Sequence, residues 1–140
     1  LIQEIVKPYI DYAKVENKTI KLELSYKKEI KVDKNKITEL LIILLDNAIK
    51  YTVENDTITI KTYSKDGKCN IEVVDTGIGI SDEGLKRVFE RFYREDKART
   101  REKGGTGLGL SIAHTIVTRH KGSIRAMHNK PKGTVFLVRI

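Results

Sequence analysis

Residues 71–80 read Ile-Glu-Val-Val-Asp-Thr-Gly-Ile-Gly-Ile, a strand pattern that runs into two closely spaced glycines. The first half alternates as a half-buried β-strand does, and the same period places Asp75 on the face of Ile71 and Val73. A carboxylate on the core side of a strand needs hydrogen bonds to compensate its burial. The glycines let the chain turn and let a ligand approach the backbone. The stretch therefore predicts either an acceptor for a flat ligand with an amine edge, such as adenine, or an ordinary Asp-Thr-Gly turn.

The composition is that of one soluble globular domain. A chain of 140 residues is long enough for its own core, and 39% hydrophobic residues argue against disorder. The longest strongly apolar run, residues 40–45, is too short to span a bilayer, and no signal-peptide pattern is visible. The single Cys69 excludes an internal disulfide and is typical of a reducing compartment. Because the chain starts at Leu1 rather than Met, we expect a domain of a longer protein.

The net charge of +8 favours anionic partners such as nucleic acid, phosphates or a membrane surface. However, the lysines and arginines are mostly interleaved with acidic residues. With three Phe and no Trp, the chain also has few side chains on which bases could stack. We therefore expect solvated lysine faces, with no nucleic-acid partner and no direct membrane contact by this domain.

The hydrophobic periodicity predicts an irregular succession of helices and strands. The expected helices cover 1–16, 34–52, a short segment capped by Ser81 and a segment that opens in the glycines of 104–111 and stops before Gly122. Pro8 predicts a kink in the first helix or a start nearer residue 7. The expected strands cover 19–26, 30–32, 57–63, 69–75, 123–128 and 134–140, with turns over 64–67 and 129–133. Without regular βαβ alternation, this pattern predicts an α+β fold. We expect a two-layer α/β sandwich with a mixed, mostly antiparallel sheet of about five strands and three main helices on one face.

The helix over 34–52 has a polar residue at the border of its apolar stripe. Asp33 is the expected N-cap, and Asn47 follows Ile43 by one turn along the edge of the stripe. The amide of Asn47 needs a partner there. Either it bonds a neighbouring loop, or its oxygen serves as a ligand for Mg²⁺.

A glycine-rich segment follows a charged one. Residues 94–103 contain no apolar residue larger than Ala98, which predicts a mobile surface loop. The sequence Gly-Gly-Thr-Gly-Leu-Gly-Leu-Ser over 104–111 then opens a helix, whose free N–H groups make a natural phosphate seat. The spacing matches neither the P-loop nor the dinucleotide-binding pattern.

Four blocks in fixed order resemble the N, G1, F and G2 boxes of sensor histidine kinases. They are Leu-Leu-Asp-Asn-Ala-Ile-Lys-Tyr-Thr at 44–52, Val-Asp-Thr-Gly-Ile-Gly-Ile at 74–80, Val-Phe-Glu-Arg-Phe-Tyr-Arg at 88–94 and Gly-Thr-Gly-Leu-Gly-Leu at 105–110. Gly-Thr-Val-Phe at 133–136 is similar to the family's last hairpin. The resemblance covers essentially the whole chain. It implies the catalytic, ATP-binding domain of a bacterial two-component sensor kinase with the Bergerat (GHKL) fold, a single domain over 1–140 with an ATP lid over about 81–106.

The resemblance also implies residue roles, with ATP and Mg²⁺ as cofactors. The implied catalytic residues are Asn47 as the metal ligand, Lys50 on the phosphates and Arg94 on the terminal phosphate. The implied nucleotide contacts are Asn47, Lys50, Tyr51, Asp75, Gly77, Gly79, Ile80, Phe89, Gly105, Thr106, Gly107, Leu108, Gly109, Leu110 and Thr134. Among these, Asp75 would accept from the adenine amine, Gly79 would pack against the ring and Thr134 would lie beneath it.

The implied partners are a dimerisation and histidine-phosphotransfer domain of the same protein, absent from this chain, and the receiver domain of a response regulator. The domain would be cytoplasmic, in a full-length sensor of the cell membrane. Two alternatives remain open, a serine kinase of the anti-sigma type and a nucleotide-sensing module without transfer. The chain upstream of Leu1 discriminates among them, because a dimerisation helix with a His-Glu motif marks the histidine kinase.

Two departures from the family pattern bear on the chemistry. Family members commonly carry Asn, and related ATPases a water-activating Glu, where this chain has Ile43, which can act neither as a metal-water ligand nor as a base. The acceptor-histidine block is missing as well, since His114, His120 and His128 lack its Glu or Asp neighbour and nearby Pro. We therefore expect neither rapid hydrolysis nor self-labelling from the isolated chain.

Overall fold

The computed structural model describes residues 1–94 and 107–140. Its elements in chain order are α1 (Ile2–Val15), β1 (Thr19–Leu24), α2 (Lys34–Lys50), β2 (Thr57–Lys65), β3 (Lys68–Asp75), α3 (Asp82–Arg87), α5 (Gly109–Arg119), β4 (Ser123–His128) and β5 (Thr134–Arg139). The strands form one sheet in the order β1-β2-β3-β5-β4. β1 and β2 are parallel, and every other neighbouring pair is antiparallel.

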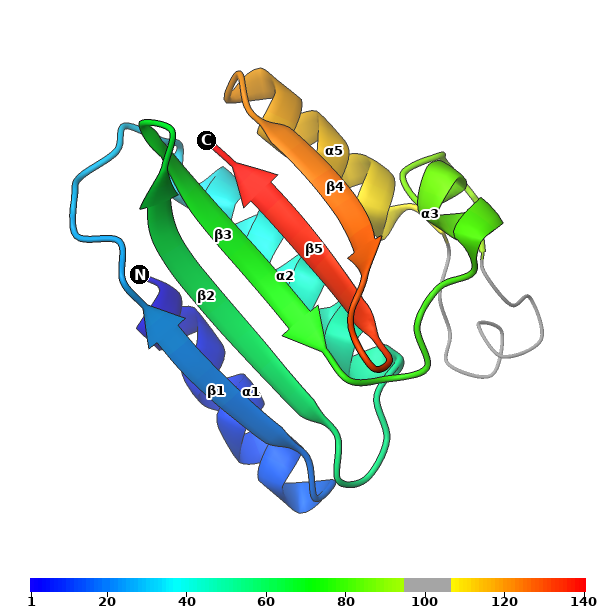
Figure 1. The fold of residues 1–140 in the computed structure, drawn as a ribbon. Helices are drawn as coiled ribbons and strands as arrows, with labels where there is room; N and C mark the ends of the chain where they lie inside the picture. Colours follow the sequence, from blue (N-terminus) through cyan, green and yellow to red (C-terminus); the bar gives the residue numbers. More distant parts are fainter. Residues whose placement is uncertain (95–106) are drawn as a thin grey trace.

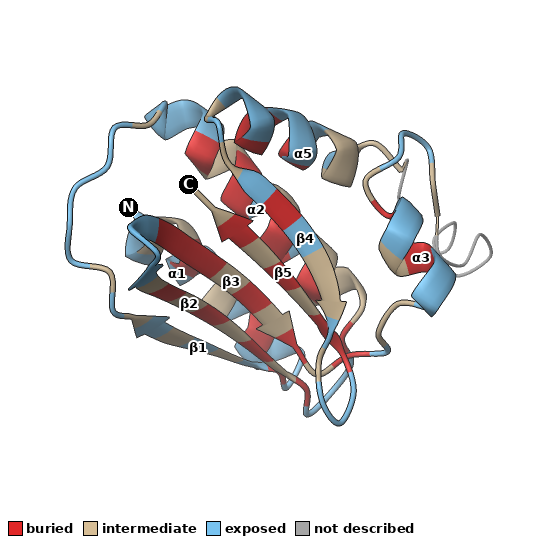
Figure 2. Ribbon diagram, turned by 45° about the horizontal axis from the view of Figure 1, so that its top comes forward, coloured by how far each residue is buried: buried red, intermediate tan, exposed pale blue. Residues whose placement is uncertain are grey.

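Helices α1, α2 and α5 lie together behind the sheet, whereas α3 lies to one side (Figure 1). Because the strands alternate, one face of the sheet turns its apolar side chains toward these helices. The buried residues gather between the two layers (Figure 2). The predicted two-layer α+β sandwich, with a mixed five-stranded sheet and three main helices on one face, is confirmed.

Helix α2 supplies the centre of the core. Six of its side chains are buried against the sheet, namely Ile37, Leu40, Leu41, Leu44, Leu45 and Ala48. They face the inward side chains of the central strands, among them Ile58, Ile60, Val73 and Phe136. Each large apolar side chain removed from water in this way stabilises the fold by roughly 1.5–3 kcal/mol. Helix α2 is thereby fixed against β3, the strand that ends at Asp75.

Side chains close both ends of α2. Asp33 is the N-cap, as predicted, and its Oδ1 accepts from the N–H of Lys36 at 3.1 Å. At the other end the Thr52 hydroxyl donates to the carbonyl of Ala48 at 2.8 Å, and Lys18 Nζ donates to the carbonyl of Ile49 at 2.9 Å. These side chains satisfy carbonyls of the last turn, so the helix ends at Lys50 rather than at the expected residue 52.

Three local expectations were wrong. Residues 30–32 form no strand, because the loop after β1 has no neighbouring strand to pair with and is held instead by the Asp33 N–H, which donates to His120 Nε2 at 3.0 Å. Helix α1 begins at Ile2 and runs through Pro8, so the start expected near residue 7 is wrong. Strand β2 continues to Lys65, so the turn shortens to Asp66 and Gly67, both with positive φ.

The importance of α2 can be measured with a pair of variants on the same helix. We expect Leu44→Ala, which empties a fully buried site, to lower the free energy of unfolding by about 2–5 kcal/mol. Ile42→Ala, at an exposed position, should change it by less than about 0.5 kcal/mol. Urea denaturation of both variants checks this, and equal losses would contradict the assigned face of the helix.

Candidate functional site

The carboxylate of Asp75 lies at the end of β3 and is only 2% exposed. The sheet register pairs Asp75 with Ile58 on β2 and Thr134 on β5. Its Oδ1 accepts two backbone hydrogen bonds, from the N–H of Gly77 at 2.9 Å and of Thr134 at 3.3 Å. Oδ2 has no hydrogen-bond partner within residues 1–94 and 107–140. One oxygen is therefore anchored, and the other remains an available acceptor.

The surroundings of Asp75 raise the pKa of its carboxyl toward neutral pH. Burial raises the pKa of its carboxyl from 3.8 to about 6. The hydrogen bonds from Gly77 and Thr134 lower the pKa, and the charge of Asp56 raises it further. The carboxyl is thus ionised at neutral pH although buried, which suits a group that accepts a hydrogen bond from an amine.

Two glycines let the backbone close around Asp75. A side chain at Gly77 would lie 2.1 Å from the carbonyl oxygen of Tyr51, and one at Gly133 would lie 1.9 Å from the carbonyl oxygen of Asp75. Gly133 also has a φ of +109°, which side chains rarely adopt. Asn129 fastens the same turn, because its Nδ2 donates to the Asp75 carbonyl at 2.9 Å. The end of β3 is therefore enclosed by the end of α2 and by the β4–β5 turn.

The predicted metal ligand lies on the last turns of α2. Asn47 is partly exposed, and its side-chain amide forms no hydrogen bond with the described residues. One turn earlier, Ile43 lies beside the start of α5, where a side chain at Gly109 would be 3.5 Å from Ile43 Cγ2. The end of α2 and the start of α5 thus lie against each other.

Asn47 offers one amide oxygen as a possible metal ligand. In the part of the chain that the structure describes, no group of three or more His, Cys, Asp or Glu side chains could hold a metal ion. An amide oxygen is a hard donor that Mg²⁺ accepts, and this ion usually keeps waters and binds phosphate oxygens at its other positions. Asn47 would be the protein ligand in that arrangement.

The other residues predicted to bind the nucleotide lie near the ends of several helices and strands. Lys50 and Tyr51 lie at the end of α2, Thr134 at the start of β5, and Leu108 to Leu110 at the start of α5. The N–H of Phe92 donates to the Gly107 carbonyl at 2.8 Å, so the 88–94 block contacts the segment before α5. Gly105 and Thr106 lie outside the described residues, as does nearly all of the loop expected to be mobile. Arg94 is the last described residue before that gap.

Phe89 and Ile80 are partly buried against the core. The ring of Phe89 lies 6.1 Å from that of Phe136 and 5.8 Å from that of His114, so it fastens the 88–94 block to the core. Ile80 also packs against the core. Gly79 has a φ of +79° and lies beside Gly133. Of these residues, Gly79 is the one that the fold places directly next to the Asp75 region.

Sequence reasoning missed Asp56, Thr76 and Asn129, whose side chains support Asp75 or its neighbours. Each comes from a loop or a strand end, where hydrophobic periodicity carries no information. The one available signal is compositional, since an Asp directly before an alternating strand and an Asn before a Pro-Lys-Gly turn both favour side-chain bonds to the backbone. That signal does not specify the partner.

Comparisons with known proteins agree with this geometry. Residues 32–140 match the model of the family described as histidine kinase-, DNA gyrase B- and HSP90-like ATPases. The chain belongs to this family. It is 47% identical over 124 residues to the sensor protein CiaH of Streptococcus pneumoniae, covering 89% of this chain and 28% of CiaH. It is 46% identical over 110 residues to the histidine-protein kinase ArlS of Staphylococcus aureus, covering 79% of this chain and 24% of ArlS. The ATPase domain described here thus spans about a quarter of these relatives.

Solved structures show the same arrangement. The catalytic domain of histidine kinase ThkA superposes with a TM-score of 0.85 at 28% identity, covering 99% of this chain and 90% of that one. ThkA in complex with the response regulator protein TrrA gives a TM-score of 0.79 at 28% identity, covering 99% of this chain and 38% of that one. The likeness to ThkA therefore extends over α1 and β1, which precede the matched family segment.

A concave surface of this ATPase domain runs along α5. It is a groove of about 660 Å³ lined by Asp33, Lys36, Arg91, Leu108, Ser111, Ile112, Thr115, Ile116, Arg119 and His120. Exposed Ile112 lies among its apolar side chains, and the cations outnumber the one acid.

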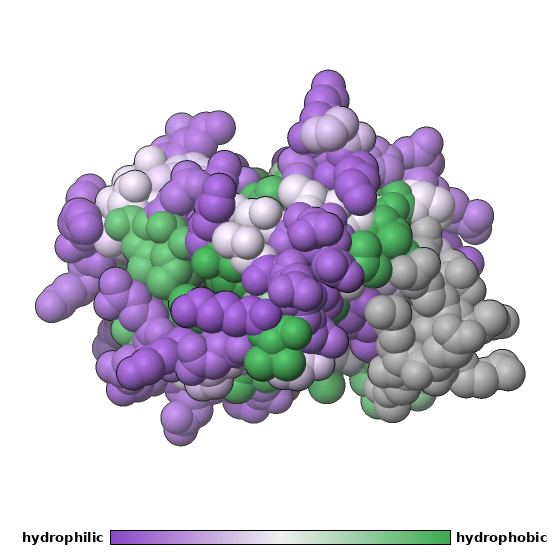
Figure 3. Space-filling view, turned by 90° about the horizontal axis from the view of Figure 1, so that it is seen from below, coloured by the Kyte–Doolittle hydropathy of each residue, from purple (hydrophilic) through white to green (hydrophobic). Residues whose placement is uncertain are grey.

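Seen from below, the end of the molecule is largely hydrophilic, with hydrophobic side chains in separate patches (Figure 3). None of the described helices is long and apolar enough to cross a membrane.

Because the pKa of Asp75 is raised in the folded protein, the free energy of unfolding should depend on pH. Since protonation favours the folded state at this site, the contribution of Asp75 to stability is greatest below about pH 4 and is lost as the pH rises through about 6. Asn would keep the oxygen that accepts from Gly77 and Thr134 without the charge. We expect Asp75→Asn to raise the free energy of unfolding at pH 7.5 by up to about 3 kcal/mol, and the gain to vanish near pH 4. Urea denaturation at both pH values tests this, and a variant less stable than wild type at pH 7.5 would refute it.

Proposed function

We propose that this chain is the ATP- and Mg²⁺-binding catalytic domain of a sensor histidine kinase. It transfers the γ-phosphoryl group of ATP to a histidine on a separate dimerisation domain, as a step in two-component signalling. The observation that carries the proposal is the buried Asp75 carboxylate in a chain of the ATPase family. One of its oxygens is anchored, and the other has no hydrogen-bond partner among the residues that the structure describes. Relatives named as sensor and histidine-protein kinases support the kinase assignment over other members of that family.

Asp75 gives the site its preference for the base. An ionised carboxyl oxygen accepts a hydrogen bond from the amine of adenine, and a charge-assisted bond of this kind is stronger than a neutral one. A base that presents a carbonyl oxygen at this point would meet a repelling negative charge. Gly79 and Gly133 leave room for a flat ring, because neither carries a side chain.

The phosphates belong at the junction of α2 and α5. The start of α5 at Gly109 offers unpaired N–H groups and the positive end of the helix dipole. Lys50 supplies a cation and Asn47 an oxygen ligand from the last turns of α2. The bound Mg²⁺ would neutralise charge on the phosphates, and the chain's own residues would position them for in-line transfer.

The histidines of the chain already have other contacts. His120 accepts from the Asp33 N–H through Nε2, and its Nδ1 bonds the carbonyl of Ile116 at 2.8 Å. His128 Nε2 lies 2.6 Å from Asp82 Oδ1, and the ring of His114 lies against Phe89. These contacts favour an acceptor on another domain. Ile43 offers no base to activate water, which favours phosphotransfer over hydrolysis.

The groove along α5 is the surface that we assign to the dimerisation domain. Its apolar side chains and the cations Lys36, Arg91 and Arg119 complement an amphipathic helix with acidic residues, and it adjoins the start of α5, where the phosphates belong. A response-regulator receiver domain would take the phosphoryl group next, by analogy with the complex of ThkA with TrrA. The domain would work in the cytoplasm as part of a membrane-anchored sensor. A nucleotide-sensing module without transfer remains the second candidate, favoured if no acceptor histidine precedes this domain.

We expect Asp75→Asn to weaken ATP binding by about 10- to 100-fold, because the amide either presents a donor to the adenine amine or loses its bonds to Gly77 and Thr134. Isothermal titration calorimetry at pH 7.5 with Mg²⁺ measures the change. The matched control is Asp66→Asn, which makes the same charge change in the exposed turn at the opposite end of β3. Equal affinity of Asp75→Asn and wild type would remove the base-binding assignment.

We also expect the isolated chain to bind ATP without labelling itself or releasing phosphate at a useful rate, since general-base assistance is worth about 10²–10⁴ in rate. Radiolabelled ATP tests this with and without the dimerisation domain that bears the acceptor histidine. Label should appear on that domain when it is supplied in trans. Ile112→Glu should reduce the transfer while leaving ATP affinity unchanged, because it places a charge in the apolar part of the groove. Label on His114, His120 or His128, or rapid phosphate release from the chain alone, would show that the transfer model is wrong.

A further inference from the structure

A second buried carboxylate lies near Asp75 and is not used by the proposed mechanism. Asp56 belongs to the loop between α2 and β2 and is 6% exposed. Its Oδ2 accepts from the N–H of Val53 at 2.8 Å, and its Oδ1 accepts from the hydroxyl of Thr76 at 2.9 Å. Lys132 Nζ, in the β4–β5 turn, lies 3.6 Å from the same Oδ1. One carboxylate therefore joins three segments that are far apart in the sequence.

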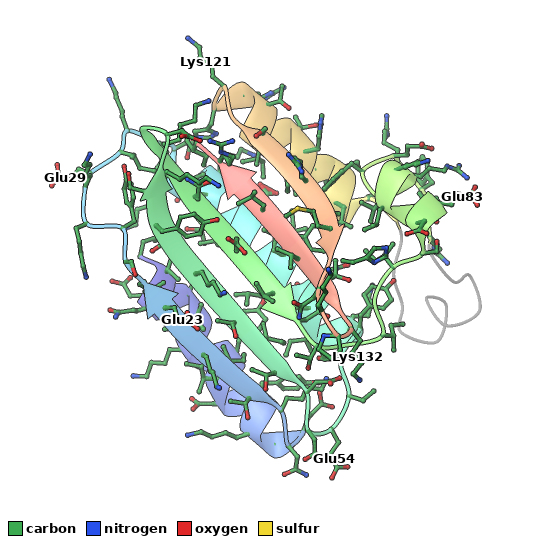
Figure 4. All side chains as sticks on the ribbon, in the orientation of Figure 1. Glu23, Glu29, Glu54, Glu83, Lys121 and Lys132 are labelled. Atoms are coloured by element: carbon green, nitrogen blue, oxygen red, sulfur yellow. The ribbon has the colours of Figure 1, made fainter. Side chains whose placement is uncertain are left out.

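Two of these connections lead directly to Asp75. Thr76 follows Asp75 in the chain, and its hydroxyl also accepts from the N–H of Thr57 at 3.0 Å. Lys132 precedes Gly133 and Thr134, and the N–H of Thr134 donates to Asp75 Oδ1. Asp56 thus holds the chain on both sides of the Asp75 carboxylate. Figure 4 shows Lys132 in the turn at the lower end of β5. Glu54, in the loop that carries Asp56, lies at the same lower end of the strands.

Asp56 and Lys132 also bear on the charge near Asp75. The strands that flank Asp75 pair it with Ile58 and Thr134, which are uncharged. The charged residues on the other segments around it are Lys50 at the end of α2, Asp56 in the next loop, and Lys130 and Lys132 in the β4–β5 turn. Asp56 raises the pKa of Asp75 by charge repulsion. The ammonium of Lys132 lies 3.6 Å from Asp56 Oδ1, a distance at which opposite charges attract and partly offset each other.

We propose that Asp56 and Lys132 act as a positioning pair for Asp75, tying both walls of the base site together and governing the pH at which the Asp75 carboxylate becomes charged. The structural half of this proposal concerns the empty protein. Its functional half, control over the pH range of ATP binding, rests on the proposed function. Neither residue is assigned a contact with the nucleotide.

The two members of the pair predict opposite effects, which a merely structural role would not give. Asp56→Asn removes the repelling charge and keeps an oxygen for the Thr76 hydroxyl, so the pKa of Asp75 should fall by about half a unit. Lys132→Met leaves the charge of Asp56 uncompensated, so the pKa of Asp75 should rise, by about half a unit or less because Lys132 is 61% exposed. Lys130→Met is the matched control, since it removes an equal charge from the same turn.

The first measurement is a carboxyl carbon NMR titration of Asp75 in the nucleotide-free protein. It needs no bound ATP, so it tests the pair even if the proposed function is wrong. Opposite shifts in Asp56→Asn and Lys132→Met, with little change in Lys130→Met, support the proposal. Shifts of the same sign, or an effect of Lys130→Met as large as that of Lys132→Met, overturn it. If Asp56→Asn does not fold, the test rests on Lys132→Met, because Lys132 is mostly exposed and its replacement should leave the fold intact. The proposal is then refuted if the pKa of Asp75 does not rise in that variant.

The second measurement is ATP affinity in Mg²⁺ between pH 5 and pH 8. The pH below which affinity declines should move down in Asp56→Asn and up in Lys132→Met, with affinities at pH 8 within about threefold of wild type. The titration of ATP itself is common to all variants and cancels in the comparison. Absence of ATP binding by wild type would count against the proposed function alone. Binding by wild type with the same pH profile in all variants would refute the functional half of the inference.

Discussion

A charged group in a place that disfavours charge is the constraint on which the rest of the molecule depends. The Asp75 carboxylate is almost fully buried at the end of β3, without a cation in direct contact among the described residues. Two backbone N–H groups, from Gly77 and Thr134, hold one of its oxygens. Burying the carboxylate destabilises the empty protein, and we infer that this is the free-energy cost of holding an acceptor in place before a ligand binds.

That constraint explains why small residues cluster where they do. Gly77 allows the chain to pass against the carbonyl of Tyr51, and Gly133 allows the β4–β5 turn to press against the carbonyl of Asp75. A methyl group at either position would separate the end of α2 or the turn from the strand. The close approach of three segments, rather than any single side chain, thus shapes the surroundings of the carboxylate.

The sequence predicted the parts of this arrangement that follow a period or a contiguous motif. The inward phase of Asp75 follows from Ile71 and Val73, and the α2 stripe and its Asp33 cap follow from helical spacing and local side-chain chemistry. What it could not predict depends on chain segments that meet only in the fold. The strand expected at 30–32 has suitable residues but no neighbour to pair with, and Asp56 becomes a hub only because Thr76 and Lys132 arrive there from β3 and the last turn.

The strand order has a consequence for how the domain is made. The last strand in the sequence, β5, lies between β3 and β4 rather than at an edge. A nascent chain that has not yet reached Thr134 lacks one of the two donors to Asp75 and also the strand that buries Val73 against Phe136. The site is therefore completed only once β5 has been made, from residues that lie about sixty positions apart in the chain. A bound nucleotide would then be a marker of a completed domain, and a domain that lacks β5 would have no half-functional form.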